Sequence, residues 1–301
     1  MTAISHTAAS LDDAGEPRDR IASWGTLLAA PYALYLVLVL LVPLGIVTVY
    51  SFFTYSTTGV ALPVLTLRNY AQLADPYFLR LIGRTAGIAL KTTAICVVLG
   101  YPLAYALARA RGALASLGFF LLLTPLMVSP VVRALGWYVL LDRNGLVNTV
   151  LVACGAGRQQ LLFSEPAVLV GLSHLLLPFM VLPLVASIER IPPSLEEAAR
   201  NLGASPLGVF RKVILPLSLP GLISGAVLVY VESASAYVLP ALLGGRFVRM
   251  IGNEVYDALL VSYNVPQAAM LTVALVVVTI GILGASMALA RRAIAVGRAS
   301  R

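Results

Sequence analysis

The sequence predicts an all-α, polytopic membrane protein with six transmembrane helices. Of its 301 residues, 59% are apolar and only 11% are charged, and the mean hydropathy is +0.92. A soluble domain averages about 45–50% apolar and about 25% charged residues, so this chain lacks the polar side chains that would cover a water-facing surface. The net charge of +8 comes from short clusters between apolar runs, which is typical of membrane orientation and not of nucleic-acid binding.

The first apolar run has no charged residue from Ile21 to Leu67, which exceeds the roughly 20 residues that a spanning helix needs. We expect the first helix near 27–54, followed by a loop rich in Ser, Thr, Gly and Pro. Residues 1–26 are polar at their start and are expected to form a disordered cytoplasmic tail.

Five further apolar runs are bounded by charged residues. We expect spanning helices there near 83–108, 113–132, 167–188, 217–241 and 266–290. The mixed stretch 134–165 is expected to be a loop with a short amphipathic helix. The membrane domain is then 27–292, and 293–301 form a cytoplasmic tail.

Two pairs of glycines have the small-xxx-small spacing that lets helix backbones approach closely in lipid. They are Gly83 with Gly87 and Gly221 with Gly225.

Six helices place both termini on one side of the membrane. If that side is the cytoplasm, its segments hold twelve Lys and Arg residues, against eight on the opposite side. This bias has the sign that the positive-inside rule requires. The sequence therefore predicts a membrane protein with both termini in the cytoplasm.

The polar segment 189–216 has the local chemistry of a helix–turn–helix hairpin. Ser194 is expected to cap a first helix, with Glu197 as its capping-box partner, and Gly203 is expected to end it. Ser205 and Pro206 then begin a second helix, with proline at the first position. The alternative is a solvated loop that merely joins two spans.

The spacing of this segment resembles the EAA loop of ABC-importer permease subunits. Glu197-Ala198-Ala199, Gly203 and Val213-x-Leu215-Pro216 lie at the positions of that motif, and Val213 replaces the usual isoleucine. The resemblance implies a type I ABC importer permease fold, with the hairpin at 189–216 in the cytoplasm. It also implies that the hairpin couples to an ATPase, and the residues expected to do so are Glu196, Glu197, Ala198, Ala199, Gly203, Pro206 and Phe210.

Three further stretches resemble the first-permease form of the spermidine/putrescine-type permeases. They are 99–109, 132–137 together with 143–148, and 237–245. The resemblance implies two ATPase subunits, a second, homologous permease, and an extracytoplasmic solute-binding protein. It also implies that the chain is embedded in the lipid of a bacterial cytoplasmic (inner) membrane. The implied substrate is a polyamine or another small cationic or zwitterionic organic solute.

Catalytic motifs are absent from the sequence. Its only lysines, Lys91 and Lys212, are not preceded by glycine, so a P-loop is excluded, and no cysteine or histidine spacing predicts a metal site. The chain is therefore expected to be a transport subunit and not an enzyme, without a cofactor of its own, while ATP and Mg²⁺ bind the partner ATPase subunits.

Polar residues inside the predicted spans are candidates for the solute pathway. An acid such as Glu232 in a spanning helix costs about 2.5–3.5 kcal/mol and is expected to face a cavity or a partner. The polyamine-type permeases carry an acid where this chain has Ala236, one helical turn away, so we expect Glu232 to take that role. Ser235, Tyr237 and Trp137 complete the predicted pathway.

Other polar residues allow two interpretations. Lys91 is expected to extend toward the membrane surface or to pair with Glu232. His174 is expected to be packed and hydrogen-bonded, and the alternative is a proton relay. The outer loop before the last helix contains Asn253, Glu254, Tyr256 and Asp257, which either contact the binding protein or are merely solvated.

The alternative function is a secondary transporter driven by an ion gradient, which would be expected to show internal repeats and broken helices around a midplane site. The sequence has no convincing repeat, and the hairpin would then have no role.

Overall fold

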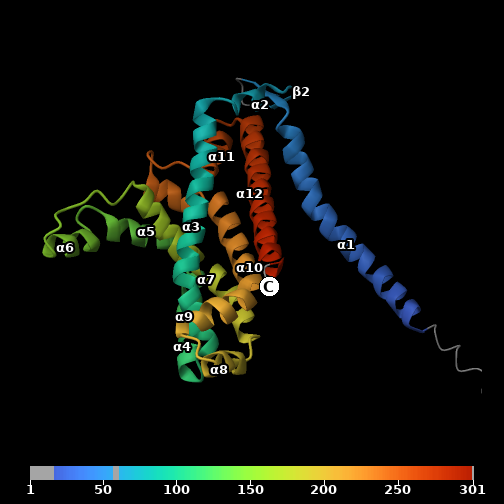
Figure 1. The fold of residues 1–301 in the computed structure, drawn as a ribbon. Helices are drawn as coiled ribbons and strands as arrows, with labels where there is room; N and C mark the ends of the chain where they lie inside the picture. Colours follow the sequence, from blue (N-terminus) through green and yellow to red (C-terminus); the bar gives the residue numbers. More distant parts are fainter. Residues whose placement is uncertain (1–16, 57–60, 300–301) are drawn as a thin grey trace, which may run out of the picture. The chain divides into compact units, whose positions relative to one another are not determined.

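The computed structural model describes residues 17–56 and 61–299 and divides the chain into two units, 1–49 and 50–301 (Figure 1). Its elements in chain order are α1 Pro17–Tyr50, β1 Phe53–Tyr55, β2 Ala61–Leu65, α2 Arg68–Gln72, α3 Pro76–Arg109, α4 Ala113–Leu123, η1 Thr124–Met127, α5 Pro130–Leu141, α6 Leu146–Ala153, α7 Glu165–Glu189, α8 Pro193–Asn201, α9 Pro206–Val209, η2 Phe210–Ile214, α10 Leu215–Ser235, η3 Pro240–Gly244, α11 Ile251–Leu260 and α12 Val265–Ala299. The described part of the first unit belongs to α1.

Both ends of the described chain are more helical than the sequence predicted. The helix α1 begins at Pro17 and ends at Tyr50, so 17–26 are helical and not disordered, while 1–16 lie outside the described residues. At the other end, α12 continues to Ala299, so most of the expected tail 293–301 extends the last helix.

The expected loop after α1 contains a small sheet. Strands β1 and β2 pair antiparallel, with Phe53 opposite Leu65 and Tyr55 opposite Ala61. The buried Asn69 in α2 fixes this segment, because its Nδ2 donates to the carbonyl oxygens of Ser51 (2.8 Å) and Phe53 (2.9 Å).

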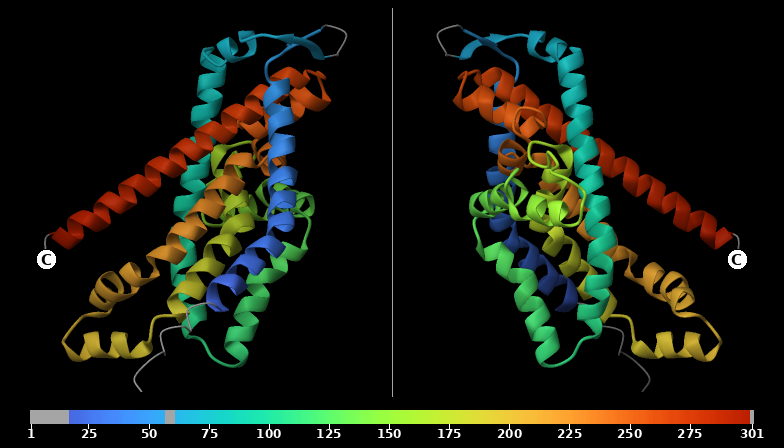
Figure 2. Two further views of the ribbon diagram at one scale, coloured as in Figure 1. Left: turned by 90° about the vertical axis from the view of Figure 1, so that its right-hand side faces the viewer. Right: turned by 90° about the vertical axis from the view of Figure 1, so that its left-hand side faces the viewer.

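The centre of the second unit is formed by α3, α7 and α10, which pack side by side (Figure 2). Gly100 of α3 and Gly225 of α10 both lie against Met180 of α7, and a Cβ at either glycine would meet Met180 atoms at 2.9 Å. The missing side chains therefore allow the three backbones to approach one another. Around this contact lies a buried apolar cluster that includes Tyr101, Leu184 and Val229.

The single helix expected at 113–132 is not continuous in the structure. The chain bends by 98° between the segments Ala113–Met127 and Pro130–Ala153. The reason is local: Ser129 is extended with ψ 137°, and Pro130 occupies the first turn of α5, where it cannot continue a preceding helix. The stretch 134–165 then contains two short helices and not one, since it includes the end of α5 and all of α6.

The predicted end of the fifth helix at 241 is also wrong. Helix α10 stops at Ser235 because Ala236 has an extended backbone (φ −63°, ψ 138°), and helical structure resumes at Val238 and continues into η3. At its start, α10 continues from α9 through the π-helical η2 and passes Pro216 without a break. The expected outer loop before the last helix contains the helix α11.

Among the described residues, four helices are long and apolar enough to cross a membrane. They lie in Pro76–Arg109, Glu165–Glu189, Pro206–Ser235 and Val265–Ser286. The bent pair would give a fifth span, and Leu34–Tyr50 is a shorter apolar helix. The count of six spans stays a prediction.

Candidate functional site

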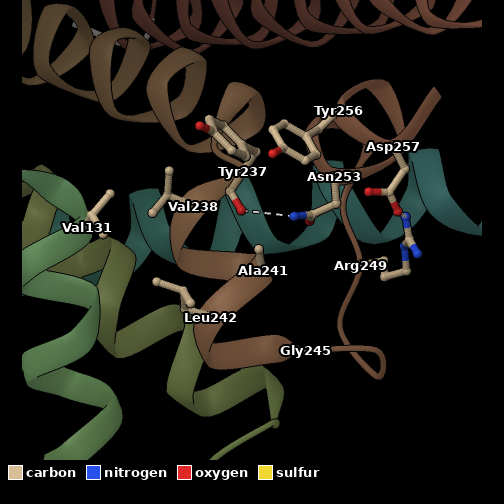
Figure 3. A pocket seen from close by; sticks show the side chains of 10 residues that line it. All are labelled: Val131, Tyr237, Val238, Ala241, Leu242, Gly245, Arg249, Asn253, Tyr256 and Asp257. Carbon is tan, nitrogen blue, oxygen red and sulfur yellow. Dashed lines mark hydrogen bonds and ion pairs between the residues drawn. The ribbon is translucent and has the colours of Figure 1, made fainter. Parts of the chain in front are cut away.

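A cavity of about 380 Å³ opens beside the break that follows α10 (Figure 3). Its lining comes from α5, the segment after α10, and α11, and consists of Val131, Tyr237, Val238, Ala241, Leu242, Gly245, Arg249, Asn253, Tyr256 and Asp257. The cavity therefore lies at a point where one apolar helix is interrupted.

The break is held open by a close approach of α11. A Cβ at Gly252 would lie 2.7 Å from the carbonyl oxygen of Ala236, so only glycine fits there. The backbone N–H of Ile251 donates to Thr85 Oγ1 of α3 at 2.9 Å. The buried Asn253 donates from Nδ2 to the carbonyl oxygen of Tyr237 at 2.9 Å (Figure 3). These contacts fix α11 against the interrupted chain.

Two tyrosines form an aromatic surface on the cavity wall. The rings of Tyr237 and Tyr256 stack with centroids 5.3 Å apart and an interplanar angle of 14°, and both side chains are partly exposed. The faces of aromatic rings attract ammonium groups. This wall is therefore suited to a cationic solute.

Beside the cavity, Arg249, Asp257 and Glu254 form one ion-pair cluster. Arg249 forms ion pairs with Asp257 and with Glu254 at 3.1 Å, and the Tyr77 hydroxyl donates to Glu254 Oε2 at 2.7 Å. Burial lowers the pKa of Arg249. The hydrogen bond to Asp257 and the charge of Glu254 raise this pKa by more than burial lowers it, so the pKa of Arg249 lies above its usual value. Arg249 is therefore positively charged and pairs with both carboxylates.

The structure separates the predicted pathway residues. Tyr237 lines the cavity, whereas Glu232 and Ser235 lie on an exposed face of α10 and are not part of the lining. Glu232 is in the last turn of α10, and not near the middle of its helix as expected. Trp137 of α5 does not line the cavity either. Its Nε1 donates to His174 Nδ1 at 3.2 Å, so His174 is packed and hydrogen-bonded as predicted.

Lys91 does not pair with Glu232. Its Nζ contacts Glu165 Oε1 at the start of α7, and both side chains are partly exposed. The sequence could not indicate this pair, because the two residues come from different helices.

Asn253, Tyr256 and Asp257 are the cavity residues whose role the sequence left undecided. The sequence places them in a loop, but α11 brings all three to the same cavity. Arg249 was not identified from the sequence at all. The available signal was the amphipathic spacing of 251–260, which predicts a short helix.

The segment 189–216 contains two short helices joined at Gly203, which has φ +84° (Figure 2). Ser205 accepts a hydrogen bond from the Gly208 N–H at 3.2 Å and caps α9, with Pro206 at its first position. Ser194 does not cap α8. The cap position is Pro192, because Pro193 already occupies the first helical position, where its missing N–H costs nothing.

The residues predicted to couple to an ATPase differ in exposure. Glu197, Ala198, Gly203 and Pro206 are exposed, while Ala199 and Phe210 are half-buried. Glu196 is buried and accepts hydrogen bonds from Arg109 and Tyr105 of α3. The sequence did not identify two apolar residues at the turn, Leu202 (88% exposed) and Leu207 (60% exposed).

Within the described part of the chain, no group of three or more His, Cys, Asp or Glu residues could hold a metal ion.

Comparison with known proteins agrees with this architecture. Residues 96–293 match the family described as "Binding-protein-dependent transport system inner membrane component". The spermidine/putrescine transport system permease protein PotB of Haemophilus influenzae is 34% identical over 245 residues, which are 81% of this chain and 86% of PotB. PotB of Escherichia coli (strain K12) is 35% identical over 246 residues, covering 81% and 90%.

A solved structure has the same fold at low sequence identity. It is a bacterial ABC transporter involved in the import of the acidic polysaccharide alginate, and one of its chains matches with a TM-score of 0.69 at 19% identity, covering 91% of this chain and 98% of that chain. The match at the level of sequence identifies the family. This chain belongs to the family of binding-protein-dependent transport system inner membrane components, the permease subunits of ABC importers.

Proposed function

We propose that this permease carries a polyamine, or another small organic cation, through a pathway that begins at the cavity beside the break in α10. The observation that carries the proposal is the wall of that cavity, where the stacked Tyr237 and Tyr256 lie next to the carboxylate of Asp257. A π-face and a carboxylate together attract an ammonium group. The substrate of the PotB relatives, spermidine or putrescine, supports the same class.

The proposed assembly has two ATPase subunits, which bind ATP and Mg²⁺, and a second, homologous permease. An extracytoplasmic binding protein delivers the solute to the cavity side. The hairpin formed by α8 and α9 docks on one ATPase subunit through its exposed residues, and both chain termini lie in the cytoplasm. The exposed Leu202 and Leu207 support this docking, because exposed apolar side chains at the tip of a hairpin are suited to burial against a partner.

Reconstitution into liposomes tests the function. Accumulation of radiolabelled spermidine is expected to require ATP on the ATPase side and binding protein on the other side, and to persist when ion gradients are collapsed. Accumulation driven by a proton or sodium gradient without ATP would contradict the proposal and would support a secondary transporter.

Substitutions test the two sites separately. Tyr237→Ala is expected to lower spermidine uptake at least tenfold while the ATPase subunits still co-purify. Glu197→Lys on the exposed face of α8 is expected to abolish co-purification. Arg143→Ala, in the exposed turn between α5 and α6, is the matched control and is expected to change neither.

A further inference from the structure

Glu196 is unlike the other charged residues of the hairpin. Of the charged side chains that the structure describes, it is the one that is buried, with 6% of its side chain exposed. Its neighbour Glu197 is exposed. Because successive residues of an α-helix point about 100° apart, one carboxylate of this pair faces outward and the other faces the helix bundle.

The buried carboxylate is bound by the end of α3. Arg109 donates to Glu196 Oε1 from Nε at 3.0 Å and from Nη2 at 2.6 Å, and the Tyr105 hydroxyl donates to Oε2 at 2.8 Å. Arg109 Nη2 also donates to the carbonyl oxygen of Ile191, in the link between α7 and α8, at 3.1 Å. Arg200, one turn along α8, lies 3.6 Å from Oε2. Both carboxylate oxygens of Glu196 are thus occupied, mainly by α3.

Removal of either partner would leave a charge buried without compensation, which proteins tolerate poorly. Charge-assisted hydrogen bonds to both oxygens of a carboxylate fix the orientation of the side chains as well as the distance between them. The contact between Glu196 and Arg109 is therefore a rigid link between α8 and α3.

The surroundings of this link differ on its two sides. Ile191, Val209 and Ile214 are buried in the same apolar cluster as Ala104 and Leu107 of α3. Nearby, an apolar cavity of about 420 Å³ lies between α3 and the segment of η2 and α10, and Tyr105 and Phe210 are among the residues that line it. Tyr105 thus contributes both to the link and to the wall of this cavity.

We propose that Glu196, Arg109 and Tyr105 form a latch that makes α3 move with α8 when an ATPase displaces the hairpin. The proposal rests on the proposed docking of the hairpin on an ATPase subunit. Glu197 and the exposed leucines belong to the docking face, whereas Glu196 is a positioning residue that transmits the displacement to α3. Helix α3 packs along α7 and α10, and its Thr85 contacts α11. The latch therefore connects the hairpin, through α3, to these three helices.

The test uses the complete complex of this permease, its partner permease, the ATPase subunits and the binding protein, in lipid nanodiscs. The readout is the ratio of ATP hydrolysis with the binding protein to hydrolysis without it. Glu196→Gln and Arg109→Ala are expected to lower this ratio at least fivefold, with ATPase subunits still co-purifying in the wild-type amount. Tyr105→Phe, which keeps the ring and removes one hydrogen bond, is expected to lower it two- to threefold.

The reciprocal variant, in which Arg109→Glu is combined with Glu196→Arg, restores opposite charges at the same two positions. It is expected to recover at least half of the wild-type ratio, a recovery that a general loss of structure would not give. Arg111→Ala, at an exposed position between α3 and α4, is the matched control and is expected to leave the ratio unchanged.

The latch is overturned if Glu196→Gln and Tyr105→Phe complexes keep the wild-type ratio. It is also overturned if the reciprocal variant assembles but keeps the low ratio of the single variants. Failure of the wild-type chain to co-purify with any ATPase subunit would instead contradict the proposed function, so the two failures are distinguishable.

Discussion

Gly221 is the residue at which a single added methyl group should disturb the helix core most. An alanine Cβ there would lie 2.4 Å from the carbonyl oxygen of Pro183 and 2.5 Å from the Cβ of Ser187, both in α7. Ordinary carbon–oxygen contacts are about 3.3–3.6 Å, so α10 and α7 would have to separate by about 1 Å. The carbonyl belongs to the backbone and cannot rotate away. Gly221→Ala should therefore destabilise the chain.

The magnitude follows from two opposing terms. Overpacking of a close-packed core costs about 1–3 kcal/mol, and the backbone contact places this variant at the upper end. Replacing glycine by alanine inside a helix returns about 1 kcal/mol. The net loss is about 2 kcal/mol, which lowers the Tm by about 3 °C for a chain of this size.

Gly83→Ala is the matched control, because a Cβ at Gly83 in α3 meets nothing within 4 Å. Its Tm is expected to equal or exceed that of the wild type. Both variants are measured in the same detergent by heating followed by fluorescence-detected size-exclusion chromatography. A Gly221→Ala variant as stable as Gly83→Ala would refute the close-packing argument.

Three further substitutions test the cavity, the pathway acid and the turn of the hairpin. Asn253→Ala leaves the carbonyl of Tyr237 without its buried donor, and a loss of about 1–3 kcal/mol is expected, seen as a lower Tm together with slower spermidine uptake; an unchanged Tm would count against this role. Glu232→Gln should reduce spermidine uptake about tenfold at equal expression, and wild-type uptake would exclude Glu232 from the pathway. Gly203→Ala forces a Cβ into the left-handed region at a cost of about 1–2 kcal/mol, and faster amide hydrogen exchange in α8 and α9 is expected; Gly136→Ala, with nothing within 4 Å and no positive φ, should leave that exchange unchanged.

The sequence predicted the long, charge-free helices well, because the requirement for about 20 apolar residues acts on composition alone. It placed α7, for example, within two residues of its observed ends. The turn at Gly203 was predicted for a similar reason, since a left-handed backbone and the Ser205 cap are determined by neighbouring residues.

The errors arose where hydropathy and chain geometry disagree. The run 113–132 is apolar enough to span a membrane, yet Pro130 begins a new helix after a sharp bend. The opposite error concerned α11, which was expected to be a loop. A helix of ten residues is too short and too polar to resemble a span. Both errors come from reading apolarity without the local backbone constraints that proline and short helices impose.

Contacts between distant residues could not be predicted from local chemistry. Arg109 and Glu196 are 87 positions apart, and Asn253 is 16 positions from the carbonyl that it binds. The two glycine pairs show the same limit. They have identical spacing, but a Cβ at Gly221 or Gly225 would collide with α7, whereas Gly83 and Gly87 have nothing within 4 Å. Spacing alone does not say which face of a helix meets a neighbour.

The end of α10 explains why an acid at Glu232 suits a cationic solute. Glu232 lies in the last turn of this helix, where the helix dipole is negative and an acid is unfavourable by about 0.3–1 kcal/mol. Helix stability therefore does not account for a glutamate at this position. The break that follows leads directly to Tyr237 and the cavity, so the negative end of the helix dipole and the Glu232 carboxylate both lie before this cavity. A cation that passes this point is attracted by both, which is the physical reason that Glu232→Gln is tested by uptake and not by stability.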